Sequence, residues 1–231
     1  EQQGAHDALV DVRATIDMAE LVRQKQPRLF DYYFQLRNKR RAEALINLNQ
    51  PKILLHVSGM FPAENGCLAP ILPLIANPNN SNEIICYNLR FDPEFLLSLS
   101  AEEIRDKLYT STTDLAYGEQ RIPLKGVHLN KSPALSPVST LGPNLAERWQ
   151  VDLAQAQRHQ RTLESNTSLK TRLLEVFAVT QTFEKNDVDT ALYDGFIGQQ
   201  DRLHCNQLLA TPPEKLSQWP KNRFSDTRLQ K

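Results

Sequence analysis

Apolar side chains near the start of the chain recur every three or four residues, at Leu9, Val12, Ile16, Ala19 and Val22. This spacing places them on one face of a helix that begins at Ala8 and ends near Gln26. Pro27 follows, and proline suits the first position of a helix. The pattern therefore predicts two consecutive helices, the second of them beginning at Pro27.

Between residues 52 and 129 the pattern changes to short apolar or alternating runs. These runs are KILLHVS, LAPILPLIA, EIICYNL and PLKGVHL, and turn sequences such as NG, NPNNSN and YGEQ separate them. Runs of this length between turns predict the strands of a small β domain. One helix interrupts the strands, because Ser100 and Glu103 have the spacing of a capping box.

The remainder of the chain is predicted to be mostly helical. Residues 130–143, NKSPALSPVSTLGP, are expected to form a proline-punctuated linker. Helical spacing returns over 144–164 and 167–179, and short helices are expected after residue 200. The last of these helices is expected to be cut at Lys231. Because the first residue is Glu rather than Met, the sequence is expected to be part of a longer protein.

Composition narrows the class of protein. No apolar run approaches the roughly 20 residues that span a bilayer, so a membrane protein is not expected. Lys plus Arg and Asp plus Glu both number 27, so any nucleic-acid surface must be local. Cys67, Cys86 and Cys205 lie far apart, which argues against a disulfide framework and a zinc site. A cytoplasmic location is therefore expected.

His6 and Asp11 stand at the start of the first predicted helix, in the spacing HxAxxD. A metal-dependent nuclease needs carboxylates to hold divalent cations and a base to activate water, and a neutral histidine can supply that base. Polar residues at a helix start also serve as caps and interact with the helix dipole. From the spacing alone, the capping interpretation is favoured.

A basic cluster follows the second predicted helix and contains Arg37, Lys39, Arg40 and Arg41. Such cations can contact phosphates along a single nucleic-acid strand, and the nearby aromatic residues Tyr32, Tyr33 and Phe34 can stack on bases. The alternative is a solvated helical face. Composition alone favours that alternative.

Several blocks of the sequence together resemble the bacterial exodeoxyribonuclease I family. They are HDALVDVRATIDMAELVRQKQPRLFDYYFQLRNK, LLHVSGMF, LYTSTTDLAYG, IPLKGVHLNKSPAL and NDVDTALYDGF. The resemblance implies a single-strand-specific 3′→5′ DNA exonuclease of the DEDD superfamily, in the branch whose last motif contains histidine. It also implies an α+β fold class, with an SH3-like β domain and attached helices.

The resemblance further implies three domains. Residues 1–26 would be the C-terminal helix of a ribonuclease H-like exonuclease domain, and residues 27–183 the SH3-like domain with helical insertions. Residues 184–231 would begin a C-terminal all-α domain that is incomplete here. In the family these domains enclose a positively charged channel for one DNA strand, which brings the interpretation of the basic cluster as a DNA contact to even odds with the solvated face.

The same resemblance assigns roles at the candidate site. His6 would be the general base and Asp11 the last of four metal-binding acids, while the other three acids would lie upstream. The full-length enzyme, expected to be a monomer, would hydrolyse single-stranded DNA to nucleoside monophosphates in repair and recombination, using Mg²⁺ or Mn²⁺. One aspartate cannot hold two metal ions. The chain alone is therefore predicted to bind no catalytic metal and to degrade no DNA.

The resemblance implies a protein partner as well, the acidic tail of the single-stranded-DNA-binding protein. Tyr32 and Lys52 match positions associated with its pocket and basic rim, and a cation beside a pocket suits a carboxylate and an aromatic ring. Alternatively, Tyr32 packs between domains and Lys52 is solvated. A competing function is a stand-alone module that binds single-stranded DNA or a partner's tail without chemistry. Acidic motif residues upstream of Glu1 would decide for the enzyme.

Overall fold

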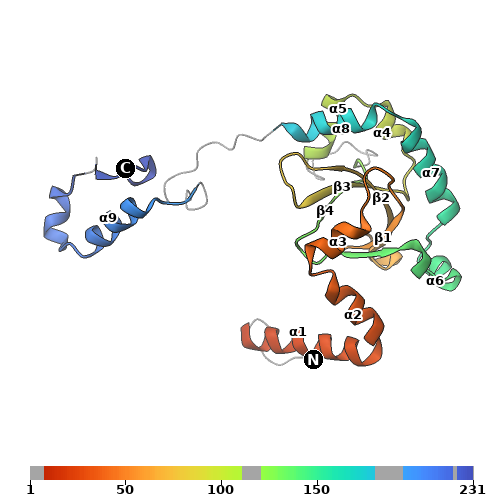
Figure 1. Ribbon diagram of the computed structural model, residues 1–231, viewed down its shortest axis with the longest axis horizontal. Coiled ribbons are helices and arrows are strands. Elements are labelled where there is room, and N and C mark those ends of the chain that lie inside the picture. The colour runs from red at the N-terminus through yellow and green to blue at the C-terminus, as the bar shows by residue number, and fades with distance from the viewer. Residues whose placement is uncertain (1–7, 111–120, 180–194, 221–222, 231) are drawn as a thin grey trace. The chain divides into compact units, whose positions relative to one another are not determined.

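The computed structural model describes residues 8–110, 121–179, 195–220 and 223–230 (Figure 1). The chain forms two compact units, residues 1–180 and 181–231, and each is described by itself. In the first unit, helices flank an antiparallel sheet, which confirms the predicted α+β class. None of the helices described has the length and apolar character needed to cross a membrane.

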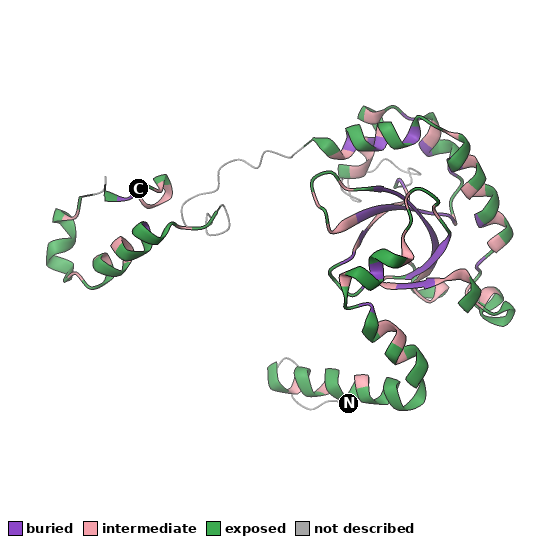
Figure 2. Cartoon of the chain, viewed as in Figure 1, coloured by how far each residue is buried: buried purple, intermediate pink, exposed green. Residues whose placement is uncertain are grey.

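The first described elements are three helices, and the opening pattern predicts the first two of them. They are α1 (Ala8–Lys25), α2 (Pro27–Gln35) and α3 (Lys39–Leu45). Asn38 begins α3, because its side-chain oxygen accepts a hydrogen bond from the backbone N–H of Arg40 at 3.0 Å. Helix α1 packs on α2, but none of its described residues is buried (Figure 2). Its predicted apolar face is therefore exposed in this chain.

Five strands form one sheet in the first unit. They are β1 (Leu54–Val57), β2 (Leu68–Ala76), β3 (Glu83–Asn88), β4 (Leu124–His128) and β5 (Ala134–Pro137). Their order is β4-β3-β2-β1-β5, and every neighbouring pair is antiparallel. The first four confirm the predicted strands.

The interpretation of residues 130–143 as a linker was wrong, because β5 lies within this segment. Leu135 is fully buried and pairs with His56 of β1. Proline lacks the N–H that a central strand needs, but an edge strand tolerates it. Pro137 ends β5 at such an edge, so the prolines that suggested a linker instead limit a short edge strand.

Both faces of the sheet are covered. Side chains alternate between the faces along each strand, so Leu72 and Tyr87 point to one core while Ile71 and Cys86 point to the other. The first core lies under the later helices of the unit, and the second lies beside α2 and α3. Burial on both faces explains why β2 and β3 read as continuous apolar runs rather than as alternating ones.

The helices over the first core are α4 (Glu94–Ser98), α5 (Ala101–Tyr109), α7 (Leu153–Ser165) and α8 (Leu169–Ala178), and the short helix α6 (Pro143–Arg148) precedes α7 without a buried residue. The predicted capping box of α5 is confirmed: the Ser100 hydroxyl accepts from the Glu103 N–H at 3.3 Å, and the Glu103 carboxylate accepts from the Ser100 N–H at 2.7 Å. Short 3₁₀ turns occupy Ala63–Asn65 and Val138–Thr140.

The single helix predicted over residues 144–164 is in fact two helices, α6 and α7. Gln150 has a φ of 53°, which is a left-handed conformation that ends α6. Asp152 then caps α7 by accepting a hydrogen bond from the Gln155 N–H at 2.9 Å. Arg90 satisfies the carbonyls freed by the break, since its guanidinium donates to the Trp149 and Gln150 oxygens at 2.8 and 2.6 Å.

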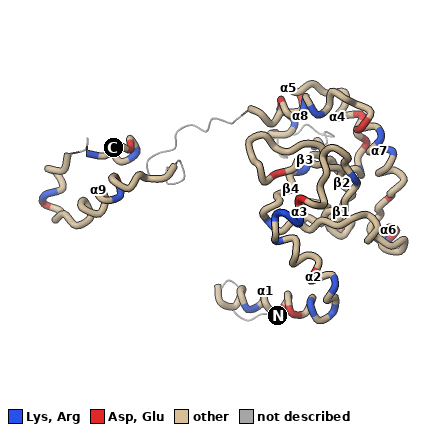
Figure 3. The backbone as a smooth tube through the Cα atoms, viewed as in Figure 1, with Lys and Arg blue, Asp and Glu red and all other residues tan. Residues whose placement is uncertain are grey.

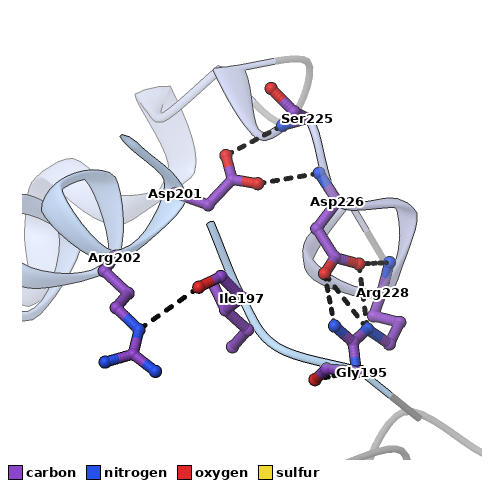
Figure 4. A network of polar contacts seen from close by, with 7 residues as sticks. All are labelled: Gly195, Ile197, Asp201, Arg202, Ser225, Asp226 and Arg228. Carbon is purple, nitrogen blue, oxygen red and sulfur yellow. Dashed lines mark hydrogen bonds and ion pairs between the residues drawn. The ribbon is translucent and has the colours of Figure 1, made fainter. Parts of the chain in front are cut away.

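The second unit contains α9 (Gln199–Leu209) and 3₁₀ turns at Pro213–Gln218 and Thr227–Leu229. Asp201 of α9 is only 4% exposed, and its carboxylate accepts from the backbone N–H groups of Ser225 and Asp226, both at 2.9 Å (Figure 4). Hydrogen bonds from Arg228 lower the pKa of Asp226 to about 2. Arg228 also donates to the Gly195 oxygen at 3.2 Å, so this network ties the two ends of the described segment together.

Candidate functional site

Of the predicted pair of His6 and Asp11, only Asp11 belongs to the described residues. His6 lies outside the described residues. Asp11 is exposed in the first turn of α1, where its backbone carbonyl accepts a hydrogen bond from the Thr15 hydroxyl at 2.9 Å. Among the described residues, no group of three or more His, Cys, Asp or Glu side chains could hold a metal ion. One carboxylate does not fit a two-metal site, so no catalytic step can be derived from the residues described.

The four cations of the basic cluster differ in their contacts: two of them interact with other side chains or carbonyls of the chain, and two do not. The Arg37 guanidinium lies 3.9 Å from the centroid of the Phe34 ring. Lys39 forms an ion pair with Glu43 at 3.4 Å and donates to the Ser81 carbonyl at 3.5 Å. The other two, Arg40 and Arg41, lie exposed in the first turn of α3. Figure 3 shows Lys and Arg positions in blue at this helix.

Arg40 and Arg41 have no side-chain hydrogen bond or ion pair with any other described residue. Their position does not favour the stability of α3, because the N-terminus of a helix carries partial positive charge and repels cations by roughly 0.3–1 kcal/mol each. Their guanidinium groups are therefore available to an anionic ligand, which would remove this repulsion. This arrangement supports phosphate binding by Arg40 and Arg41, whereas Arg37 and Lys39 already have contacts within the chain.

A second cationic surface was not found from the sequence. It is a cavity of about 300 Å³, here called the Lys125 groove. Its lining residues are Met60, Phe61, Pro62, Asn88, Phe91, Lys107, Leu108, Arg121, Ile122, Pro123, Leu124 and Lys125. Cations together with exposed aromatic rings are what single-stranded nucleic acids require, because the cations bind phosphates and the rings stack on bases. The cations come from separate segments, so no local charge run revealed them.

Lys125 stands on the edge strand β4 and is partly buried. Its Nζ lies 2.8 Å from the Met60 Sδ, and a thioether is only a weak hydrogen-bond acceptor. Burial lowers the pKa of Lys125, and the Glu83 carboxylate partly opposes this shift. No carboxylate among the described residues lies within ion-pair distance of this ammonium group. A phosphate oxygen would therefore be a stronger partner than the one that Lys125 now has.

Lys52 lines a larger cavity of about 710 Å³, here called the Lys52 pocket. Its walls include Leu72, Leu74, Leu163 and Leu169, and Lys170 and Glu164 lie at its polar side. The Lys170 ammonium donates to the Leu48 carbonyl at 3.1 Å. The pocket thus combines a leucine wall with two lysines.

Tyr32 is not among the residues that line the Lys52 pocket. It packs against the second core, and its ring meets that of Tyr33 edge-on with centroids 5.3 Å apart. Its hydroxyl is buried without a hydrogen-bond partner among the described residues, and burial raises its pKa. The structure therefore does not bring Tyr32 and Lys52 into one pocket.

Two family models match the chain. The model described as the Exonuclease I SH3-like domain matches residues 37–179, and the Exonuclease I C-terminal domain matches residues 186–231. Exodeoxyribonuclease I of Escherichia coli (strain K12) is 40% identical over 232 residues, covering 100% of this chain and 48% of the relative. The Haemophilus influenzae protein of the same name is 38% identical over 220 residues, covering 94% and 46%.

A solved structure gives the same result. The crystal structure of E. coli exonuclease I in complex with a dA16 oligonucleotide matches with a TM-score of 0.82 at 40% identity, covering 99% of this chain and 49% of that chain. The chain spans about half the length of the curated relatives that it matches. These matches confirm the predicted SH3-like domain. Because the SH3-like model alone matches more than half of its residues, the chain belongs to the exonuclease I family.

Proposed function

We propose that the chain is part of a 3′→5′ exodeoxyribonuclease that hydrolyses single-stranded DNA to nucleoside monophosphates with Mg²⁺ or Mn²⁺. Its own contribution is to hold the strand, while the metal site is completed by residues outside those described. The observation that carries this proposal is the 40% identity to exodeoxyribonuclease I along the whole chain. His6 as base and Asp11 as metal ligand are part of the proposal.

The positions of the two cationic surfaces support a continuous path for a strand. Lys39, at the start of α3, donates to the carbonyl of Ser81, which comes just before β3. Glu83 at the start of β3 pairs with His128 at the end of β4. Lys125 lies three residues back along β4, which corresponds to about 10 Å of extended chain. The edge strand β4 thus connects the first turn of α3 to the Lys125 groove.

DNA binding and DNA hydrolysis by this chain can be measured separately. The 231-residue chain should bind fluorescently labelled dA16 but should not shorten it in Mg²⁺ or Mn²⁺, because one carboxylate cannot clamp two cations. Fluorescence anisotropy measures the binding, and denaturing gel electrophoresis measures the strand length. E. coli exonuclease I serves as the active control. Metal-dependent shortening by this chain that EDTA abolishes would contradict the expected inactivity.

The competing function is a stand-alone module without chemistry, which would need only the two cationic surfaces. It predicts the same binding result, so the gene upstream of Glu1 must decide. A DxE pair followed by a further aspartate, restored to the protein, should produce metal-dependent degradation of dA16. A longer protein with no such acids, or one that binds but never degrades the strand, would decide for the module.

We also propose that the Lys52 pocket binds the tail of a protein partner. A tail with acidic residues and a terminal aromatic ring suits the Lys52 pocket, because its carboxylates can meet Lys52 and Lys170 while the ring lies against the leucines. The tail of the single-stranded-DNA-binding protein has this chemistry in the family that the sequence resembles. Tyr32 would act from the other side of the sheet, through the packing of α2.

Lys52→Glu should weaken binding of such a tail peptide about tenfold while leaving dA16 binding unchanged, because it places a negative charge at the pocket. Lys131→Glu is the matched control, since Lys131 is exposed in the turn between β4 and β5 and does not line the pocket. Anisotropy with labelled peptide gives both affinities. Equal losses in the two variants would mean that only net charge matters.

Tyr32 is tested in the same assay. Tyr32→Ala should weaken peptide binding and spare dA16, whereas Tyr32→Phe keeps the ring packing and removes only the buried hydroxyl. Loss of both ligands in Tyr32→Ala, with neither lost in Tyr32→Phe, would show that the domain had been destabilised and that Tyr32 has no role at the tail site.

A further inference from the structure

The chain has two methionines, Met18 and Met60, and both are exposed. Met60 is 74% exposed in the connection between β1 and β2, and Met18 is 60% exposed on α1. Their surroundings differ in one respect. Met60 lines the Lys125 groove with its Sδ 2.8 Å from the Lys125 Nζ, whereas Met18 lies on a helix that does not line this groove.

The backbone holds Met60 in this position. The Met60 N–H donates to the Ser58 hydroxyl at 3.3 Å, and the next N–H, that of Phe61, donates to the Ser58 carbonyl at 2.9 Å. The Phe61 ring packs against the second core and meets the His56 ring edge-on. The thioether is therefore presented at the groove by a hydrogen-bonded turn with an aromatic anchor beside it.

Oxidation would change the partner that Lys125 has. The thioether sulfur attacks one oxygen of hydrogen peroxide, the O–O bond breaks, and a sulfoxide and one water molecule form. Sulfur loses two electrons in this step and the peroxide gains them. The sulfoxide oxygen carries partial negative charge and is a far better acceptor than the thioether. It would form within reach of the Lys125 ammonium.

We propose that Met60 is a reversible oxidation site through which peroxide weakens binding of a single DNA strand at the Lys125 groove. The inference rests on the proposed function, since it requires that the groove binds phosphates. When Met60 is reduced, Lys125 loses only its weak contact with the thioether sulfur on binding a phosphate. With the sulfoxide, it must first break a charge-assisted hydrogen bond, so the affinity should fall about fivefold.

The experiment compares the reduced and the peroxide-treated chain. Both are treated with dithiothreitol to return reversibly oxidised cysteines to thiols, and mass spectrometry locates the added oxygen. Anisotropy with labelled dA16 should show the fivefold loss in the native chain and in Met18→Leu. Methionine sulfoxide reductase should restore the affinity. The affinity of Met60→Leu should not respond to peroxide, when the treated and untreated samples of this variant are compared with each other.

Two results would overturn the inference while leaving the proposed function in place. One is unchanged dA16 affinity in a chain whose Met60 is shown to be oxidised. The other is an equal loss in the native chain and in Met60→Leu. By contrast, a reduced chain that does not bind dA16 at all would refute the strand-binding function itself, and the inference with it.

The variant Lys125→Gln tests whether the Met60 sulfoxide weakens DNA binding through the Lys125 ammonium group. This variant should bind dA16 more weakly before oxidation, and peroxide should then produce no further loss. A further fivefold loss in Lys125→Gln would show that the sulfoxide does not act through the ammonium group, and would overturn this part of the inference.

Discussion

Replacing both Arg40 and Arg41 by glutamate should weaken binding of a single DNA strand about a hundredfold at low salt. Both guanidinium groups are exposed and have no side-chain partner among the described residues, so each is available for one charge-assisted contact with a phosphate. A contact of this kind contributes about 1.4 kcal/mol, or a factor of ten. Losing two of them gives the expected effect, which anisotropy with labelled dA16 measures.

The salt dependence is a second readout of the same variant. Each phosphate contact on a single strand contributes about 0.7 to the slope of log affinity against log salt concentration, so losing two should reduce the slope by about 1.4. The affinities of the native chain and the variant should therefore converge as salt is raised. Unchanged affinity and slope would exclude the first turn of α3 from the DNA surface.

A control variant distinguishes the effect of the net charge of the chain from the effect of where the charges lie. Arg158→Glu combined with Arg161→Glu changes the net charge by the same amount, and both residues are exposed on α7 over the other core. This control should lose much less affinity. If both double variants weaken binding equally, the effect comes from the overall field and α3 has no special role.

Stability offers an independent check on the α3 variant. Glutamates in the first turn of a helix interact favourably with the partial positive charge there, whereas arginines do not. The variant should therefore be at least as stable as the native chain while binding far less DNA. A drop in the denaturation midpoint would point to misfolding as the cause of the lost affinity.

Local sequence signals predicted most of the elements, because the interactions that form them are local. Helix α5 is an example: its capping box needs only Ser100 and Glu103, three residues apart. The four predicted strands also follow from runs of apolar residues between turns. In each case the physical cause lies within one short segment, so the sequence pattern contains it.

The features that sequence analysis missed depend on distant partners. The break between α6 and α7 is held by Arg90, whose guanidinium bonds to a carbonyl 60 residues away in sequence. The difference between Lys39 and its neighbours depends on Ser81, 42 residues away. The Lys125 groove collects Met60, Phe91 and Lys125 from three separate segments. No pattern within one window contains such contacts.

Tyr87→Ala should lower the free energy of unfolding of the first unit by about 4 kcal/mol. Tyr87 is 0% exposed, faces the first core from the central region of the sheet, and is the largest of the fully buried side chains described. Truncating an aromatic side chain of this size removes its apolar contacts and leaves a cavity. Chemical denaturation measures the change, and dA16 binding should fall because Asn88, the next residue, lines the Lys125 groove.

Tyr87→Phe is the matched variant, because it keeps the ring and removes only the hydrogen bond from the hydroxyl to the Asp92 carbonyl at 3.0 Å. This substitution should lower the free energy of unfolding by about 1 kcal/mol. Burial raises the pKa of the Tyr87 hydroxyl above its usual value of 10.0, so above that pH the unfolded chain loses this proton before the folded chain does. The native chain should therefore lose stability more steeply than Tyr87→Phe as the pH rises past 10.0. Parallel pH profiles would contradict the raised pKa of the buried hydroxyl. A similar loss of stability for both substitutions would show that ring packing at Tyr87 is not what holds the end of β3 beside the groove.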